Sequence, residues 1–234
     1  MTITTRAGKG SELSHAELDE NFTDLRDGVA LQTPKAKGAG GIKVDSEGSP
    51  TYPWHDVLGV LQVYGEVGDA SRAAFRGGIK ALQFDENDSS YVDFHFPHDY
   101  VPNSDIYVHI HWSHGGALVT GGSVTWGVEF TYAKGHNQAA FPNTATLSVV
   151  SSAPTTAYQH MINEVQGSSA GGSASTVDRA ELEADGVGMA RIYLDSNDIL
   201  VSGGSKPAPF VHYVDLHYQS TGVGTKNKEP DFWA

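Results

Sequence analysis

The chain has 234 residues, no cysteine, 27 glycines, 10 prolines and a formal net charge of −13. Without cysteine the protein has no disulfide, no thiolate metal ligand and no cysteine nucleophile. The acidic balance argues against a nucleic-acid partner, because binding a polyanion needs a concentrated basic surface. No apolar run reaches about 18 residues and residues 1–20 lack a signal-peptide core, so we expect a soluble protein made without signal-peptide export and without membrane insertion.

Residues 11–28, SELSHAELDENFTDLRDG, predict a short α-helix near the N-terminus. Ser14 and Glu17 have the spacing of a capping box, and Leu13 and Leu18 have that of a hydrophobic staple. These four residues predict that the helix begins just after Ser14.

A narrow apolar stripe follows this start, at spacings of 4, 3 and 4: Leu18, Phe22, Leu25 and Val29. Gly28 lies near the expected end of the helix. A helix of about 12 residues is marginal in water by itself. We therefore expect Leu13, Leu18, Phe22 and Leu25 to pack against another surface, either the chain's own β domain or a neighbouring protein.

The high glycine and proline content and the 10% of aromatic residues predict a mainly β protein. Alternating segments predict eight strands, at 57–64, 79–84, 90–96, 106–112, 123–132, 145–150, 187–194 and 210–218. This pattern predicts an antiparallel, jelly-roll-like sandwich, preceded by the short helix and a linker. The expected division is an N-terminal anchoring segment over 1–29, a linker over 30–53 and a β-sandwich domain over 54–234.

Two segments interrupt the rhythm of strands. Residues 151–175 include the sequence QGSSAGGSAS, which predicts a mobile loop, and residues 176–185 favour a helical turn. Residues 91–114, YVDFHFPHDYVPNSDIYVHIHWSH, contain two alternating runs around a proline-marked turn. We expect these two runs to form adjacent antiparallel strands, with apolar side chains on one face and imidazoles on the other.

His109 and His111 leave the same face of a strand about 7 Å apart, so together they are candidate ligands of a transition metal. The sequence HIHWSHGG resembles the paired-histidine strand of alpha-type carbonic anhydrases. His136, 25 residues further on, is the candidate third ligand of a zinc lyase or hydrolase. A second interpretation places the His109 and His111 strands of three copies around one metal ion on a three-fold axis, an arrangement that resembles the iron sites of phage spike tips and long tail fibres.

The third interpretation needs no metal, and the histidines of this stretch then line a polar sheet face or a subunit interface: His95, His98, His109, His111 and His114. No G-x-S-x-G, Walker or dinucleotide-binding pattern occurs. Acidic loops at 45–47 and 85–88 are expected to be solvated turns. Exposed aromatic residues bind sugars in many proteins, and the candidates here are Tyr52, Trp54, Tyr100 and Trp112.

Residues 10–25 resemble the short module that opens many tailed-bacteriophage fibre and appendage proteins. The matching positions are Gly10, Leu13, Ser14, Ala16, Glu17, Leu18, Asp19, Asn21, Phe22 and Leu25. The segments FRGGIKALQF and FPHDYVPNSDIYVHIHWSH also resemble parts of phage virion proteins. The resemblance implies a module that anchors an appendage to the virion, usually as a trimer.

We therefore expect a non-enzymatic structural component of the virion, a trimeric tail-fibre-like or fibre-adaptor protein. Its partners are other virion proteins and its own copies, with a host-surface glycan as a further candidate for viral attachment. A capsid decoration or head-fibre protein is the first alternative. The zinc-dependent lyase or hydrolase is the second.

Overall fold

Strands with alternating burial account for most of the part of the chain that the computed structural model describes, residues 10–16, 18 and 52–232. Two compact units divide the chain, residues 1–53 and residues 54–234. The strands are β1 Trp54–Gly59, β2 Ser71–Arg76, β3 Ile79–Gln83, β4 Ser89–His95, β5 Ile106–Ser113, β6 Val119–Gly121, β7 Ser123–Ala133, β8 Ala145–Ser152, β9 Met161–Gln166, β10 Ser168–Ser169, β11 Val177–Asp178, β12 Val187–Asn197, β13 Leu200–Val201 and β14 Phe210–Gln219.

Seven of the eight predicted strands are present, and the predicted strand at 57–64 is present in part as β1, which ends at Gly59, so the mainly β class is confirmed. The helical turn expected within 176–185 is the 3-10 turn η1, Arg179–Glu181, capped by the side chain of Asp178. The loop predicted over 151–175 is wrong in part, because it contains β9 and β10. β9 pairs along the strand that carries His109 and His111.

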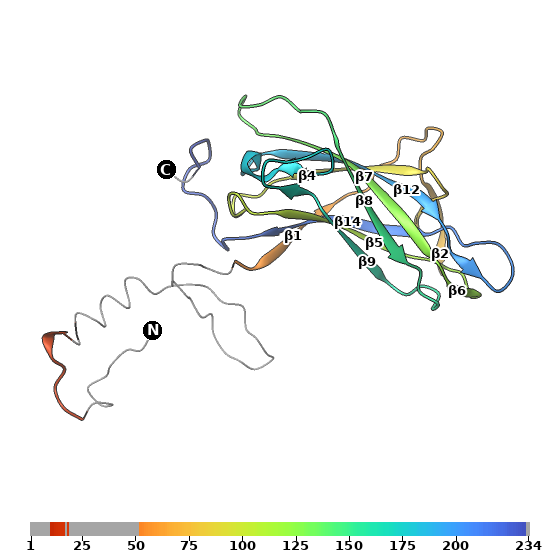
Figure 1. The fold of residues 1–234 in the computed structure, drawn as a ribbon, viewed down its shortest axis with the longest axis horizontal. Helices are drawn as coiled ribbons and strands as arrows, with labels where there is room; N and C mark the ends of the chain where they lie inside the picture. Colours follow the sequence, from red (N-terminus) through yellow and green to blue (C-terminus); the bar gives the residue numbers. More distant parts are fainter. Residues whose placement is uncertain (1–9, 17, 19–51, 233–234) are drawn as a thin grey trace. The chain divides into compact units, whose positions relative to one another are not determined.

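Two main antiparallel sheets build the β domain. The first sheet has the order β2-β3-β14-β5-β9, with β1 also paired to β14, and the second has the order β4-β12-β7-β8. In Figure 1 the labels of β4, β7 and β12 lie above those of β1, β14, β5 and β9. Two smaller ribbons, β10-β11 and β13-β6, complete the strands of the described residues.

The prediction that β4 and β5 are adjacent strands is wrong. β4 pairs with β12 in the second sheet, whereas β5 lies between β14 and β9 in the first. The connection over residues 96–105 therefore crosses from one sheet to the other. Both strands still bury one face, which is why the alternation of their sequences is the same in either arrangement.

The core lies between the two sheets and is built from the inward face of each. β5 contributes four fully buried side chains and β7 another four: Ile106, Val108, Ile110, Trp112, Val124, Trp126, Val128 and Phe130. The rings of Trp112 and Trp126 join the sheets, with their centroids 6.1 Å apart. Each such side chain stabilises the fold by about 1.5–3 kcal/mol through burial. The opposite face of β5 is thereby fixed as the outward one, and it carries His109 and His111.

The start of the predicted helix lies within the described residues, but its remainder does not. His15, Ala16 and Leu18 are helical, and the Leu18 amide donates a hydrogen bond to the Ser14 carbonyl at 3.1 Å. Phe22, Leu25 and residues 30–51 of the linker lie outside the described residues, so the helix beyond its first turn stays a prediction. In the part of the chain that is described, no helix is long and apolar enough to cross a membrane.

Candidate metal centre on the outer face of the first sheet

Strand register gathers a set of imidazoles and carboxylates on the outward face of β5. Asp215 of β14 lies directly opposite His109 on one side, and Glu164 of β9 lies opposite it on the other. Residues directly opposite each other in a sheet have Cβ atoms about 4.5–5.5 Å apart, so their side chains meet. His111, two residues along, shares this face. We call His109, His111 and Asp215 the central cluster.

The carboxylate of Asp215 lies between the two imidazoles of the central cluster. His109 Nδ1 is 3.2 Å from Asp215 Oδ1, and His111 Nε2 is 2.8 Å from Asp215 Oδ2. The side chains of His109, His111 and Asp215 are 14%, 6% and 4% exposed. One donor atom from each residue lies within 4.8 Å of the other two, which is the spacing of groups able to hold a metal ion.

The outer nitrogens of both imidazoles also have partners. His109 Nε2 lies 2.9 Å from Glu164 Oε2, and His111 Nδ1 lies 2.9 Å from His160 Nε2. The Tyr213 ring stacks on His111 with centroids 3.9 Å apart, and the His160 ring stacks on it at 5.0 Å. These contacts fix the orientation of each ring relative to Asp215.

Two buried atoms of the central cluster have no hydrogen-bond partner: His111 Nε2 and Asp215 Oδ1. His111 Nε2 lies within ion-pair range of Asp215 Oδ2, and Asp215 Oδ1 lies within ion-pair range of His109 Nδ1, but neither contact has the geometry of a hydrogen bond. Leaving a buried polar atom unsatisfied costs about 1–3 kcal/mol. The central cluster therefore contains two potential ligand atoms, one on His111 and one on Asp215, that no described protein group satisfies by a hydrogen bond.

The electrostatic environment shifts the pKa values of the two imidazoles in opposite directions. The nearby carboxylate of Asp215, helped by Glu164, raises the pKa of His109 to about 9 against the opposing effect of burial. Burial lowers the pKa of His111, and the neighbouring His160 and His109 add to this, while Asp215 opposes it. Burial likewise lowers the pKa of His212 on β14.

A second group of potential ligands shares His109 and lies further from the core. Asp56 of β1 and His217 of β14 are paired across the strands, with His217 Nδ1 2.5 Å from Asp56 Oδ1. The His217 ring stacks between His109, at 4.5 Å, and Trp54, at 4.7 Å. Asp56 and His217 already satisfy each other through their hydrogen bond, so this group lacks the unsatisfied buried atoms of the central cluster.

The structure does not bring His136 to His109 and His111, so the ligand set predicted for a zinc lyase or hydrolase is wrong. His136 Nε2 lies 3.0 Å from Asp185 Oδ2. Asp185 also pairs with His95 at 3.3 Å and with His98 at 2.9 Å. The third potential ligand of His109 and His111 is the carboxylate of Asp215.

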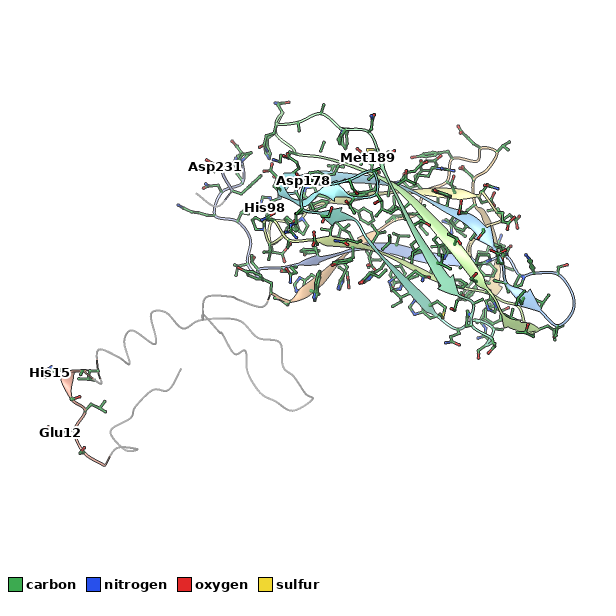
Figure 2. The ribbon with its side chains drawn as sticks, viewed as in Figure 1. Glu12, His15, His98, Asp178, Met189 and Asp231 are labelled. Atoms are coloured by element: carbon green, nitrogen blue, oxygen red, sulfur yellow. The ribbon has the colours of Figure 1, made fainter. Side chains whose placement is uncertain are left out.

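Asp185 is the centre of a separate, more solvated cluster. The hydrogen bond from His136, helped by the charges of His98 and His95, lowers the pKa of Asp185 against a smaller opposing effect of burial. Phe232 of the C-terminal segment is buried and packs its ring edge-on against His98 and His136. Figure 2 labels His98 and, near it in the same view, Asp231 of this segment.

Several of the other predicted positions have ordinary structural environments. Two of the aromatic candidates for sugar binding, Tyr100 and Trp112, are core residues, whereas Trp54 is 45% exposed. His114 is fully buried, and its Nε2 lies 2.7 Å from the carbonyl oxygen of Pro154. In the acidic loop at 85–88, the Asp88 carboxylate accepts a hydrogen bond from the Asp85 amide, as in a tight turn.

Sequence patterns did not identify Asp215, Glu164 or His160 as members of the site. The signal for Asp215 is an acidic residue at an outward position of its strand, between the inward Val214 and Leu216. Glu164 and His160 lie within or beside β9, in the segment predicted as a loop. Their positions depend on which strands pair, and no local pattern specifies that.

A pocket of about 470 Å³ lies away from the central cluster, lined in part by Tyr100, Leu182 and Phe232. No residue of the central cluster lines it. Comparisons of the chain with protein-family models and with curated proteins found no match.

Proposed function

We propose that this protein is a non-enzymatic structural component of a tailed-phage virion, which docks through its N-terminal helix and presents its β domain for contact. The observation that carries the proposal is the module over residues 10–25, with its capped start and narrow apolar stripe. Leu18, the one stripe residue that is described, is 38% exposed. A narrow apolar stripe on a short helix is suited to a helix seam or to a groove on another protein.

The β domain, in this proposal, is a jelly-roll sandwich. A jelly roll joins eight antiparallel strands into two sheets through two Greek keys, and viral capsid and lectin domains use it for contact. The strand orders β3-β14-β5-β9 and β4-β12-β7-β8 support this assignment, because successive strands alternate between the sheets at every step except β7 to β8. Such a domain presents loops and sheet faces without requiring catalysis.

The assembly that this proposal favours is a trimeric tail-fibre-like or fibre-adaptor protein. Leu13, Leu18, Phe22 and Leu25 would form the anchoring surface between copies or against another virion protein. The β domain would then meet a host surface, including its glycans, or a neighbouring virion protein. A capsid decoration or head-fibre protein is the alternative location for the same architecture.

The experiment that tests docking replaces one stripe residue in the full chain. Phe22→Asp places a charge in the stripe, so we expect incorporation into particles to fall at least about 10-fold, because burying an unpaired charge costs several kcal/mol. Thr23→Asp is the matched control, since it adds the same charge at a position off the stripe. Incorporation is measured by quantifying the protein in purified particles, and circular dichroism checks that the β domain remains folded.

Normal incorporation of Phe22→Asp would contradict the docking role of the stripe. Equal losses in Phe22→Asp and Thr23→Asp would show that added charge, not the apolar contact, impairs incorporation, and would also contradict it.

A further inference from the structure

We propose that His109, His111 and Asp215 bind one divalent transition-metal ion, of the zinc class, on the outer face of β5 and β14. This inference goes beyond the virion role, since it assigns a metal site within a single chain. It differs from a three-fold metal site because all three ligands come from one copy. It differs from a carbonic-anhydrase-like site because a carboxylate takes the place of the third histidine.

The ligand chemistry suits such an ion. Imidazole nitrogen and carboxylate oxygen together bind zinc and neighbouring first-row metals, at about 2.0–2.2 Å. Two donors that share an ion at this distance lie roughly 2.8–3.1 Å apart in octahedral geometry and roughly 3.3–3.6 Å apart in tetrahedral geometry. The two nitrogen–oxygen separations in the central cluster are 3.2 Å and 2.8 Å.

The neighbours of the cluster supply what a metal-bound histidine requires on its other nitrogen. A ligating histidine almost always engages its second nitrogen with a carboxylate or another acceptor, which fixes the tautomer and the ring orientation. Here His109 Nε2 meets Glu164, and His111 Nδ1 meets His160, each at 2.9 Å. The remaining nitrogens, His109 Nδ1 and His111 Nε2, are the two that lie nearest Asp215.

Burial provides a separate argument. His111 Nε2 and Asp215 Oδ1 have no hydrogen-bond partner and sit on side chains that are 6% and 4% exposed. An ion bound between them would coordinate both atoms and remove this cost. A purely hydrogen-bonded network would instead leave them unsatisfied.

The proposed metal site also connects three neighbouring strands of the first sheet, β14, β5 and β9. Its ligands come from β5 and β14, and the groups that orient them come from β9 and the segment before it. Metal binding to the folded chain stabilises it, because the unfolded chain does not present the same preformed site. The ion would thus brace the outward face of the first sheet.

The test uses the full chain, stripped of metal with a chelator and titrated with Zn²⁺ by calorimetry, with elemental analysis after dialysis. We expect one equivalent of zinc per chain and a higher thermal midpoint. Asp215→Asn should weaken binding at least about 100-fold, because it removes a ligand charge at nearly constant shape. Glu164→Gln, at an exposed side chain that does not threaten folding, should weaken binding about 10–100-fold.

Two further variants locate the ion on this face. His212→Gln is the matched control, because His212 lies on the outward face of β14 but bonds to Ser113 instead of Asp215, and zinc binding should stay unchanged. His217→Gln tests the more exposed group of Asp56, His109 and His217, and binding should change less than threefold.

Three results would overturn the proposal. One is the absence of stoichiometric zinc binding by the folded full chain. Another is binding that survives Glu164→Gln at full affinity but is lost in His217→Gln, which would place the ion in the outer group. The last is one-third of an equivalent per chain in a trimer, which would place the ion between copies. None of these results bears on docking through residues 10–25, so failure of the metal site and failure of the proposed function are distinguishable.

Discussion

Asp215 and Asp185 each face more than one imidazole, but burial gives the two clusters different chemistry. The Asp215 side chain is 4% exposed and its Oδ1 atom lacks a hydrogen bond, whereas the Asp185 side chain is 22% exposed and pairs with three imidazoles. Water screens the Asp185 pairs and reduces what each contributes to stability. A metal ion is therefore expected at the buried cluster, and ordinary ion pairing at the solvated one.

The Asp185 cluster makes a prediction about acid stability. The pKa of Asp185 is lowered in the folded chain, chiefly by the hydrogen bond from His136. A carboxylate whose folded pKa is depressed contributes stability above its unfolded pKa, near 3.9, and this contribution is lost as the pH falls through the folded value. Asp185→Asn should therefore reduce stability at pH 7 while flattening the loss of stability from about pH 4 downward.

The measurement is the urea midpoint as a function of pH for the full chain and for Asp185→Asn. Asp195→Asn, which removes an equal charge at an exposed position of β12, is the matched control. If the slopes of Asp185→Asn and the parent coincide below about pH 4, the Asp185 pairs do not stabilise the folded state.

Single residues also show where sequence reasoning reaches its limit. The i, i+2 spacing of His109 and His111 on one strand face is visible in the sequence. Asp215 lies 104 residues after His111 and comes opposite His109 only through the pairing of β5 with β14. His136 is closer to the pair in sequence, but the fold directs it to Asp185. Sequence distance was therefore misleading for the third ligand.

At the scale of elements, alternation predicted eight strands but missed β9, whose inward face carries a polar residue. β9 has Met161, Asn163 and Val165 on its inward face, and the central asparagine breaks the apolar pattern. The asparagine is there because it accepts a hydrogen bond from the indole N–H of Trp112, inside the core. The buried polar residue Asn163 thus interrupts the apolar alternation, and β9 was not predicted as a strand.

The bond between Trp112 and Asn163 leads to a prediction about β9. Asn163→Leu replaces the amide by an apolar side chain with the same branching and leaves the buried indole N–H of Trp112 without its acceptor. We expect the free energy of unfolding to fall by about 1–3 kcal/mol. Denaturant unfolding followed by tryptophan fluorescence measures this change.

Ile162→Ala is the control within the same strand, since Ile162 is exposed and its truncation should change stability by less than about 0.5 kcal/mol. If Ile162→Ala lowers the free energy of unfolding as much as Asn163→Leu does, then substitution at any position of β9 destabilises the fold. The hydrogen bond to Trp112 would then not be the cause.

The connection between β4 and β5 shows a different limit of local patterns. Pro97 and Pro102 mark a turn, and both flanking strands alternate, which suits a hairpin within one sheet as well as a crossing between facing sheets. Strand pairing decides between them, and β4 pairs with β12, almost a hundred residues later in the chain. Topology therefore depends on contacts that a window of neighbouring residues does not contain.

For the molecule as a whole, the mainly β class followed from composition and alternation, whereas the start of the first strand at Trp54, three residues before the predicted one, and the order of strands in each sheet did not. Every member of the buried core cluster lies between Ala70 and Tyr218, and the partly buried side chains packed against it begin at Val57. All of these residues belong to the compact unit formed by residues 54–234.

Because residues 54–234 form a compact unit, we predict that they fold without the first 53 residues. Because the buried residues of the described core all lie within this range, we expect the thermal midpoint of the truncated chain to lie within about 2–4 °C of that of the full chain, which corresponds to less than about 1 kcal/mol for a domain of this size. Removing the anchoring segment should at the same time abolish incorporation into particles and reduce a trimeric mass in solution. Calorimetry, light scattering and particle composition measure the three quantities on the same preparation. A large drop in the midpoint would mean that the opening segment packs on the β domain of its own chain, and its apolar stripe would then be a part of that fold instead of a contact with the virion.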